Sequence, residues 1–413
     1  MIKLDDIIKT ITGRMLKITE LIGAGAEGCV AKAMDVKTGK IFAVKIFHPD
    51  RSNDHTITRI KYLCAQELHK ASSCLVTPIE LINSGGMVGY VMSHVQGIPL
   101  QQFLETTPMT FMQLLVCLVL VAQALVRLHA RKISHGDIRQ ANVLVWLDGN
   151  VPRVCIIDFD NFSAAGAPKP TCLGDEMYLA PEQHESVKAK KPVPPDMGSD
   201  KYSFRIMAEE ILTLRHPSAA FLEPIERFEH AMYTCWVHDP ARPPVPGVGG
   251  HPATILNARV ANLFRRGMSR DPAKRPELAE WLDELLAAMH EVYVCPKCHK
   301  PCLVDASKTV CPQCSKRFPD ICLVLPDGRK IHITQGLMQI GRAELNADNM
   351  VSAIHAVLRR VGPLVTMECF GMNGTFLKSG DSWLRLEDRK PIFLSPGDVI
   401  RFANVEVRVE QVA

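Results

Sequence analysis

A short loop with the sequence HGDIRQAN combines a carboxylate, a cation and an amide. Asp137 could accept a proton from an attacking hydroxyl, and Arg139 could neutralise charge on a moving phosphoryl group. Asn142 offers an oxygen to a metal ion, and Asp158, sixteen residues further on at the end of an apolar stretch, could hold Mg²⁺. These residue types at this spacing favour phosphoryl transfer.

Three glycines upstream, Gly23, Gly25 and Gly28, follow an apolar stretch. Glycines at this spacing let backbone amides approach phosphate oxygens, although a glycine-rich hairpin without a ligand gives the same pattern. Lys45 lies among apolar residues in the sequence FAVKI, and a buried lysine is costly unless it is paired with an anion or a carboxylate. Glu67, in a predicted helix, is the candidate carboxylate.

The elements that must position these residues follow from hydrophobic periodicity. Alternating apolar residues over 15–47 predict antiparallel strands joined by tight turns, and helical periodicity dominates from about residue 103. The apolar stretch 111–126 is shorter than the roughly 20 residues that span a bilayer, which predicts a buried helix. Residues 1–13 lack the apolar core of a signal peptide.

Composition narrows the class of protein. The chain has 413 residues, of which 47% are hydrophobic and 22% charged, as in globular proteins. Its net charge of +4 gives no reason to expect a nucleic-acid partner. We therefore expect a cytoplasmic protein of two or three domains with neither a nucleic-acid nor a membrane partner.

The ordered motifs over about residues 14–290 resemble those of the eukaryotic-type Ser/Thr protein kinases, including bacterial ones. The glycine loop fits GxGxxGxV, FAVK fits the VAIK strand, and HGDIRQAN stands where HRDLKxxN is usual. DFD replaces DFG, and Glu182 ends an APE motif. Asp200 resembles the buried aspartate of the central helix, and Arg275 resembles the arginine that pairs with the APE glutamate. The resemblance implies an α+β fold, the bilobal protein kinase fold.

The resemblance also implies a role for each matching residue. Backbone amides of residues 23–28 would cover the phosphates of ATP, and Lys45, braced by Glu67, would contact the α- and β-phosphates. Asp137 would be the catalytic base, assisted by Arg139. Two further residues would hold Mg²⁺ or Mn²⁺, namely Asn142 and Asp158. The adenine would lie among Val30, Ala43, Met92, Leu144 and the backbone of Ser93 to Val95. The implied function is an ATP-dependent Ser/Thr kinase acting on itself and on partner proteins.

Four positions depart from the family pattern. Gly136 replaces the arginine that docks a phosphorylated activation loop, and Arg139 replaces a lysine. Asp160 replaces the glycine of DFG and adds a carboxylate near the metals. Asp175 replaces a threonine that usually bridges to the catalytic aspartate. Two alternatives follow: a catalytically silent kinase-like scaffold or phosphopeptide adaptor, and a small-molecule phosphotransferase of the aminoglycoside or choline type, which HGD and IIDFD also resemble.

Two CPxC motifs separated by twelve residues come next in the chain. Each can present two thiolates to one tetrahedral ion at about 2.3 Å, as in a zinc ribbon with a structural Zn²⁺. The predicted ligands are Cys295, Cys298, Cys311 and Cys314. His299 and Cys302 are spare ligands nearby. The alternative, two redox CxxC pairs, lacks a flanking βαβ pattern.

Residues 319–413 have the short strands and turns of a small β-sandwich, with a final strand predicted over 399–409. They resemble a forkhead-associated (FHA) domain, which binds phosphothreonine peptides. The resemblance implies that Arg342 and Ser352 contact the phosphate and Asn373 holds the ligand backbone. Ala353 stands where a second basic residue often meets the phosphate, so a degenerate docking module is the alternative. The matching motifs are GR at 341–342, SAIH at 352–355 and NGT at 373–375. In these motifs Gly341 and His355 would have architectural roles.

We therefore predict three domains: a kinase over 1–292, a zinc ribbon over 293–318 and an FHA domain over 319–413. A kinase fused to a phosphothreonine reader suggests that the reader captures a product of the kinase, in cis or on a partner. The candidate autophosphorylation sites are Thr171, Thr10 and Thr12. Because Gly136 cannot clamp a phosphate, we expect such a mark to act mainly by recruiting the reader.

Overall fold

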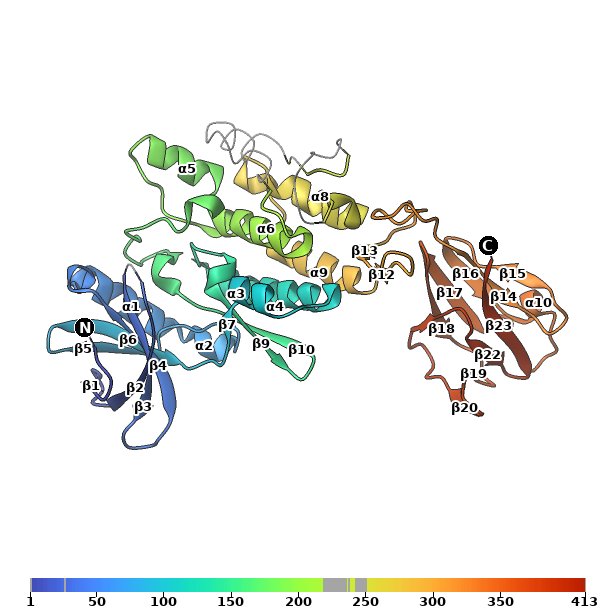
Figure 1. Ribbon diagram of the computed structural model, residues 1–413, viewed down its shortest axis with the longest axis horizontal. Helices are drawn as coiled ribbons and strands as arrows, with labels where there is room; N and C mark the ends of the chain where they lie inside the picture. Colours follow the sequence, from blue (N-terminus) through green and yellow to red (C-terminus); the bar gives the residue numbers. More distant parts are fainter. Residues whose placement is uncertain (1, 26, 218–235, 237, 242–250, 413) are drawn as a thin grey trace. The chain divides into compact units, whose positions relative to one another are not determined.

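The computed structural model describes residues 2–25, 27–217, 236, 238–241 and 251–412. The chain divides into two units, one formed by residues 1–251 and 262–286 and the other by 252–261 and 287–413 (Figure 1). The second unit contains both regions predicted as a zinc ribbon and an FHA domain. The boundaries near residues 292 and 318 stay a prediction.

The first unit begins with an antiparallel sheet whose strand order is β1-β2-β3-β4-β6-β5 (Figure 1). Apolar residues that alternate along β3 and β4 are buried in its core, among them Ala31, Ala33 and Val44. Helix α1 (Asp54–Gln66) contacts β5 and β6, and its N-cap residue Asn53 accepts a bond from Thr56 N at 3.0 Å. The short α2 (Leu68–Ala71) follows. The strands are β1 (Ile7–Lys9), β2 (Met15–Ala24), β3 (Gly28–Asp35), β4 (Ile41–Phe47), β5 (Glu80–Ser84) and β6 (Met87–Ser93).

Two long helices form the core of the second half of this unit. Helix α4 (Phe111–Ala130) starts at a capping box between Thr110 and Gln113 and packs on α6 (Met197–Thr213). By length and composition alone α4 could span a membrane. Half of its twenty residues are buried against its neighbours, however, so the predicted buried helix is confirmed. Among the described residues, the other helices before β12 are α3 (Leu100–Thr106), α5 (Pro181–Lys188), α8 (Ala258–Gly267) and α9 (Leu278–Met289); residues 258–261 of α8 and 287–289 of α9 are assigned to the second unit.

Short strands hold the loops that carry the candidate catalytic residues. Strands β7 (Ile98–Pro99), β9 (Val143–Asp148) and β10 (Val151–Ile156) form one small sheet. Strands β8 (Ile133–Ser134) and β11 (Ser163–Ala164) pair with each other. The pairing of β8 with β11 therefore joins the loop after β8, which contains Asp137, to the segment after β10, which contains Asp158.

The second unit starts with the hairpin of β12 (Val292–Val294) and β13 (Pro301–Leu303). Two antiparallel sheets follow, in the orders β15-β14-β23-β22-β19-β20 and β16-β17-β18-β21, and one apolar cluster lies between them (Figure 1). The strands are β14 (Asp320–Val324), β15 (Lys330–His332), β16 (Gly336–Ile340), β17 (Ala356–Val361), β18 (Leu364–Cys369), β19 (Thr375–Ser379), β20 (Ser382–Arg385), β21 (Ile392–Leu394), β22 (Val399–Phe402) and β23 (Val405–Val412).

The prediction of a single final strand over 399–409 is wrong. The segment is a hairpin of β22 and β23, which turns at Ala403 with φ +54°. Ala403 N donates to Gly374 O at 3.0 Å, a long-range contact that fixes this turn.

Candidate functional site

The loop that contains Asp137 is fixed by a buried carboxylate of α6. Asp200 accepts bonds from His135 N at 2.7 Å and Gly136 N at 2.8 Å. Gly136 has φ +81°, and a Cβ there would lie 2.3 Å from Asn161 O. A side chain at this position would therefore be strained in the local backbone, which suits glycine.

The predicted base and its neighbours are brought together. Asn142 Nδ2 donates to Asp137 Oδ2 at 2.8 Å, and Arg139 Nε lies 3.4 Å from the same oxygen. Asp175 N donates to Asp137 Oδ1 at 3.1 Å, and the Asp175 carboxylate pairs with Arg139 Nη1 at 3.0 Å. Asp175, which replaces the threonine usual in the family, thus contacts the predicted base Asp137 through its backbone N–H.

Lys45 is buried, with 8% of its surface exposed, and faces three carboxylates. Its Nζ donates to Asp158 Oδ1 at 2.8 Å and to Asp160 Oδ2, and lies 3.8 Å from Glu27 Oε2. Burial alone would lower the pKa of Lys45, but Asp160 and Asp158 raise it above its usual range. Burial raises the pKa of Asp160.

The predicted pairing of Lys45 with Glu67 is wrong. Glu67 caps the C-terminal end of α1 with φ +47°, and its exposed carboxylate pairs with Lys70 at 2.5 Å. Sequence reasoning missed Asp160 and Glu27 as neighbours of Lys45. The signal for Asp160 was present, because a carboxylate stands where the family has glycine.

The other predicted nucleotide-binding residues line one open cleft of about 800 Å³. Gly28 differs from the other two glycines, because a Cβ there would lie 2.1 Å from Ile46 O on β4, whereas Gly23 and Gly25 have no atom within 4 Å of the same position. The predicted residues in the cleft lining are Gly23, Gly25, Gly28, Val30, Ala43, Lys45, Met92, Ser93, Val95, Asp137, Arg139, Leu144 and Asp158.

The donor set next to this cleft suits a hard divalent cation. The side-chain nitrogen of Asn142 is used by Asp137, so the oxygen of its amide is the atom it can offer a metal. Asp158 adds a carboxylate that is 36% exposed. Oxygen-only ligands are those that Mg²⁺ prefers, so the residues fit the predicted ion.

Behind the cleft, Glu182 and Arg275 form the predicted ion pair. The guanidinium binds both carboxylate oxygens, at 2.8 Å and 2.6 Å, and the Arg275 side chain is fully buried. A bidentate pair of this kind ties the first turn of α5 to the segment that contains Arg275.

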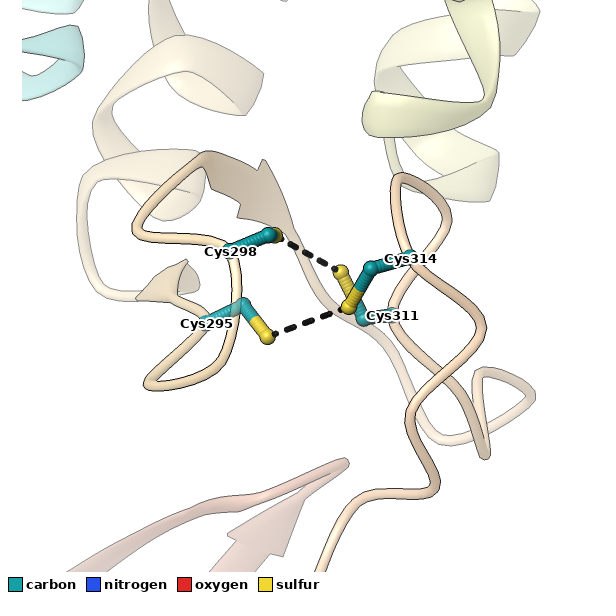
Figure 2. Close-up of side chains that lie close together, drawn as sticks. All are labelled: Cys295, Cys298, Cys311 and Cys314. Atoms are coloured by element: carbon teal, nitrogen blue, oxygen red, sulfur yellow. Dashed lines mark hydrogen bonds between the residues drawn. The ribbon is translucent and has the colours of Figure 1, made fainter.

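Four cysteines in the second unit point toward a common centre (Figure 2). The sulfurs of Cys295 and Cys314 are 3.7 Å apart, and those of Cys298 and Cys311 are 3.8 Å apart. Thiolates on a tetrahedral Zn²⁺ at about 2.3 Å would be about 3.8 Å apart, so the four residues fit the ion. Burial opposes ionisation of Cys295, but backbone N–H groups of residues 298 and 297 lower its pKa to about 7.

Arg342 begins the short helix α10 (Arg342–Leu345), whereas the other two predicted phosphopeptide residues, Ser352 and Asn373, lie in loops. Arg342 Nε donates to the carbonyl of residue 351 at 3.1 Å, and Asn373 Nδ2 donates to that of residue 350 at 2.7 Å. Ser352 Oγ accepts from Met372 N at 3.3 Å. The structure therefore brings Arg342, Ser352 and Asn373 into one region of the β-sandwich.

Comparison with known proteins identifies the first part of the chain. Residues 16–286, more than half of the chain, match the model of the protein kinase domain. The chain is 26% identical over 288 residues to serine/threonine-protein kinase pkn2 of Myxococcus xanthus, covering 66% of this chain and 32% of that protein. It is 27% identical over 281 residues to serine/threonine-protein kinase PrkC of Bacillus subtilis, covering 66% of this chain and 40% of PrkC.

A crystal structure of a double mutant of the Mycobacterium tuberculosis PknI kinase domain covers 70% of this chain, with 99% of its own length aligned, a TM-score of 0.47 and 19% identity. The chain thus spans about a third to two fifths of the length of the two curated relatives named above. The chain belongs to the protein kinase domain family.

Proposed function

We propose that this chain is an ATP-dependent Ser/Thr protein kinase that phosphorylates itself and partner proteins. The observation that carries the proposal is that Lys45, Asp137 and Asp158 line one cleft, in which Lys45 contacts Asp158 and Asp137 is bonded to Asn142. Membership of the protein kinase domain family and two relatives named as serine/threonine kinases support it.

In the proposed reaction, Asp137 accepts the proton of a substrate hydroxyl. The hydroxyl oxygen forms a bond to the γ-phosphorus, and the bond between that phosphorus and the bridging oxygen breaks, which releases ADP. Lys45 holds the α- and β-phosphates, and Arg139 lies close enough to Asp137 to offset charge there. When bound, Mg²⁺ neutralises phosphate charge; Asn142 and Asp158 would hold it.

The second unit is proposed to combine a structural zinc ribbon with an FHA-type reader of phosphothreonine. The sulfur spacing supports Zn²⁺, and a closed set of four thiols leaves no position for catalysis. The hydrogen-bonded region around Arg342, Ser352 and Asn373 supports a phosphothreonine-containing protein as partner. We propose that the kinase and its phosphothreonine reader act in the cytoplasm.

Thr171 is the favoured autophosphorylation site. It is exposed, and its hydroxyl accepts a bond from Arg51 Nη1 at 2.7 Å. Thr10 is only 4% exposed, and Thr12 donates to Glu80, whose charge would repel a phosphate. Because Arg51 offers a cation to a phosphate on Thr171, the mark would order the activation segment as well as recruit the reader.

Intact mass before and after incubation with Mg²⁺ and ATP tests the proposal. We expect mass increments that correspond to phosphate and map to serine or threonine residues. One of these sites should be Thr171, and the Thr171→Ala variant should lack that increment. No increment on the chain or on any added protein, despite nucleotide binding, would favour a silent scaffold. Transfer only to an aminoglycoside or choline would favour a small-molecule phosphotransferase.

A further inference from the structure

The buried face of helix α1 presents a cation, Arg59, to the activation segment. Arg59 lies on the buried face of α1 and is only 7% exposed. Its guanidinium donates to Asp160 O at 2.8 Å, to Phe162 O at 2.7 Å and to Pro168 O, and lies 4.1 Å from the centre of the Phe162 ring. The helix is thus tied to the main chain of the activation segment.

The carboxylate that pairs with Lys45 must therefore come from an element other than α1. Kinases of this family usually brace this lysine with a glutamate of the helix, which an arginine cannot replace. Asp158 contacts Lys45, but under the proposed function it also holds Mg²⁺. The proposed function does not assign Mg²⁺ to Asp160, although its carboxylate lies within 4.8 Å of those of Glu27 and Asp158. Its side chain is 12% exposed, and it accepts bonds from Lys45 Nζ and from Tyr90 OH at 3.3 Å.

We propose that Asp160 is the positioning residue of Lys45, replacing the helix carboxylate, while Arg59 ties α1 to the segment that carries Asp160. The inference rests on the proposed kinase function and concerns the same cleft. Its physical basis is charge balance. Without Asp160, the buried ammonium would keep Asp158, whose charge a bound metal would share, and Glu27, whose Oε2 lies 3.8 Å away.

The substitution Asp160→Gly restores the family's own DFG motif, yet it should lower activity. Asp160→Gly and Asp160→Asn are each expected to lower kcat/KM on the order of 10- to 100-fold, since each removes a charged hydrogen-bond acceptor from Lys45. Glu67→Gln, at the exposed end of α1, is the matched control and should retain wild-type kcat/KM. The Mg²⁺ concentration for half-maximal rate should stay the same in all variants.

A double-mutant cycle separates positioning of Lys45 from a general effect on the fold. Affinity for Mg·ADP is measured calorimetrically on the full chain, with thermal unfolding as the check of folding. Asp160→Asn should weaken binding in the wild type but have no further effect in a Lys45→Met background. Equal effects in both backgrounds would overturn the inference.

Three other results would also overturn it. Asp160→Gly could be as active as the wild type, Glu67→Gln could be as impaired as Asp160→Asn, or excess Mg²⁺ could restore Asp160→Asn, which would make Asp160 a metal ligand. Failure of the proposed function looks different, because the wild type itself would then transfer no phosphate while still binding Mg·ADP.

Discussion

Replacing Gly28 with alanine should destabilise the kinase unit, whereas replacing Gly25 should not. The Cβ of Gly28→Ala would lie 2.1 Å from Ile46 O, 2.8 Å from Phe47 Cα and 2.9 Å from Ile46 C. All three atoms belong to the backbone of β4, so no side-chain rotation relieves the contact. Strands β3 and β4 would have to separate, although they pair through Gly28 and Phe47.

The expected size follows from the cost of overpacking, which is about 1–3 kcal/mol. For a unit of this size, roughly 2–4 °C is lost per kcal/mol, so the Tm of Gly28→Ala should fall by about 2–12 °C. Gly25→Ala meets no atom within 4 Å, and a change of about 0.5 kcal/mol or less is expected. Because Gly25 lines the nucleotide cleft, the KM of Gly25→Ala for ATP should rise.

Thermal unfolding followed by circular dichroism, with and without Mg·ATP, measures both effects on the full chain. The reasoning predicts a fall in Tm confined to Gly28→Ala and a weaker nucleotide-induced rise in Tm for Gly25→Ala. Equal Tm values for the two variants in the absence of nucleotide would refute it.

Three further predictions concern the metal, the reader and the activation segment. The purified chain should contain about one zinc ion per molecule by elemental analysis, and Cys298→Ser should lose it while Cys302→Ser keeps it. Arg342→Ala should weaken binding of a phosphothreonine peptide at least about tenfold by calorimetry, because a charge-assisted bond to phosphate is lost. Arg51→Ala should remove any gain in kinase rate that phosphorylation of Thr171 confers, measured on samples whose phosphorylation is defined by mass spectrometry.

Each of these predictions has a clear contrary result. Zinc retained by Cys298→Ser would show that the four thiols are not the ligand set. If Arg342→Ala bound the phosphothreonine peptide as tightly as the wild type does, the proposed phosphothreonine-binding site would be wrong. The same would follow if the wild type bound the unphosphorylated peptide as tightly as the phosphorylated one. A full response of Arg51→Ala to phosphorylation would place the phosphate-binding cation elsewhere.

Local signals were enough for much of the fold and the site. The order of motifs from the glycine loop to Arg275 resembles that of protein kinases and predicted a kinase domain, which the family match over residues 16–286 confirms. The CPxC pairs placed four sulfurs in one cluster, since each turn holds two thiols at fixed separation. The apolar pattern of 111–126 correctly predicted a core helix.

What the sequence could not supply was the partner of each charge across long separations. Glu67 was selected by residue type in a helical stretch, yet α1 ends at Gln66 and the helix turns Arg59 inward instead. Asp160 and Lys45 are 115 residues apart in the chain, and their contact depends on how β4 meets the segment after β10. Likewise, contact between Arg51 and Thr171 follows from tertiary packing and has no local signature.

The most direct test of the proposed kinase activity is the initial rate of transfer from γ-labelled ATP to protein, in Mg²⁺ and in Mn²⁺, for the wild type and Asp137→Asn. The account predicts label on serine or threonine with the wild type and a rate lower by several orders of magnitude with Asp137→Asn, while both bind Mg·ADP alike. Equal rates for the two proteins, or no transfer to protein by a wild type that binds nucleotide, would contradict it.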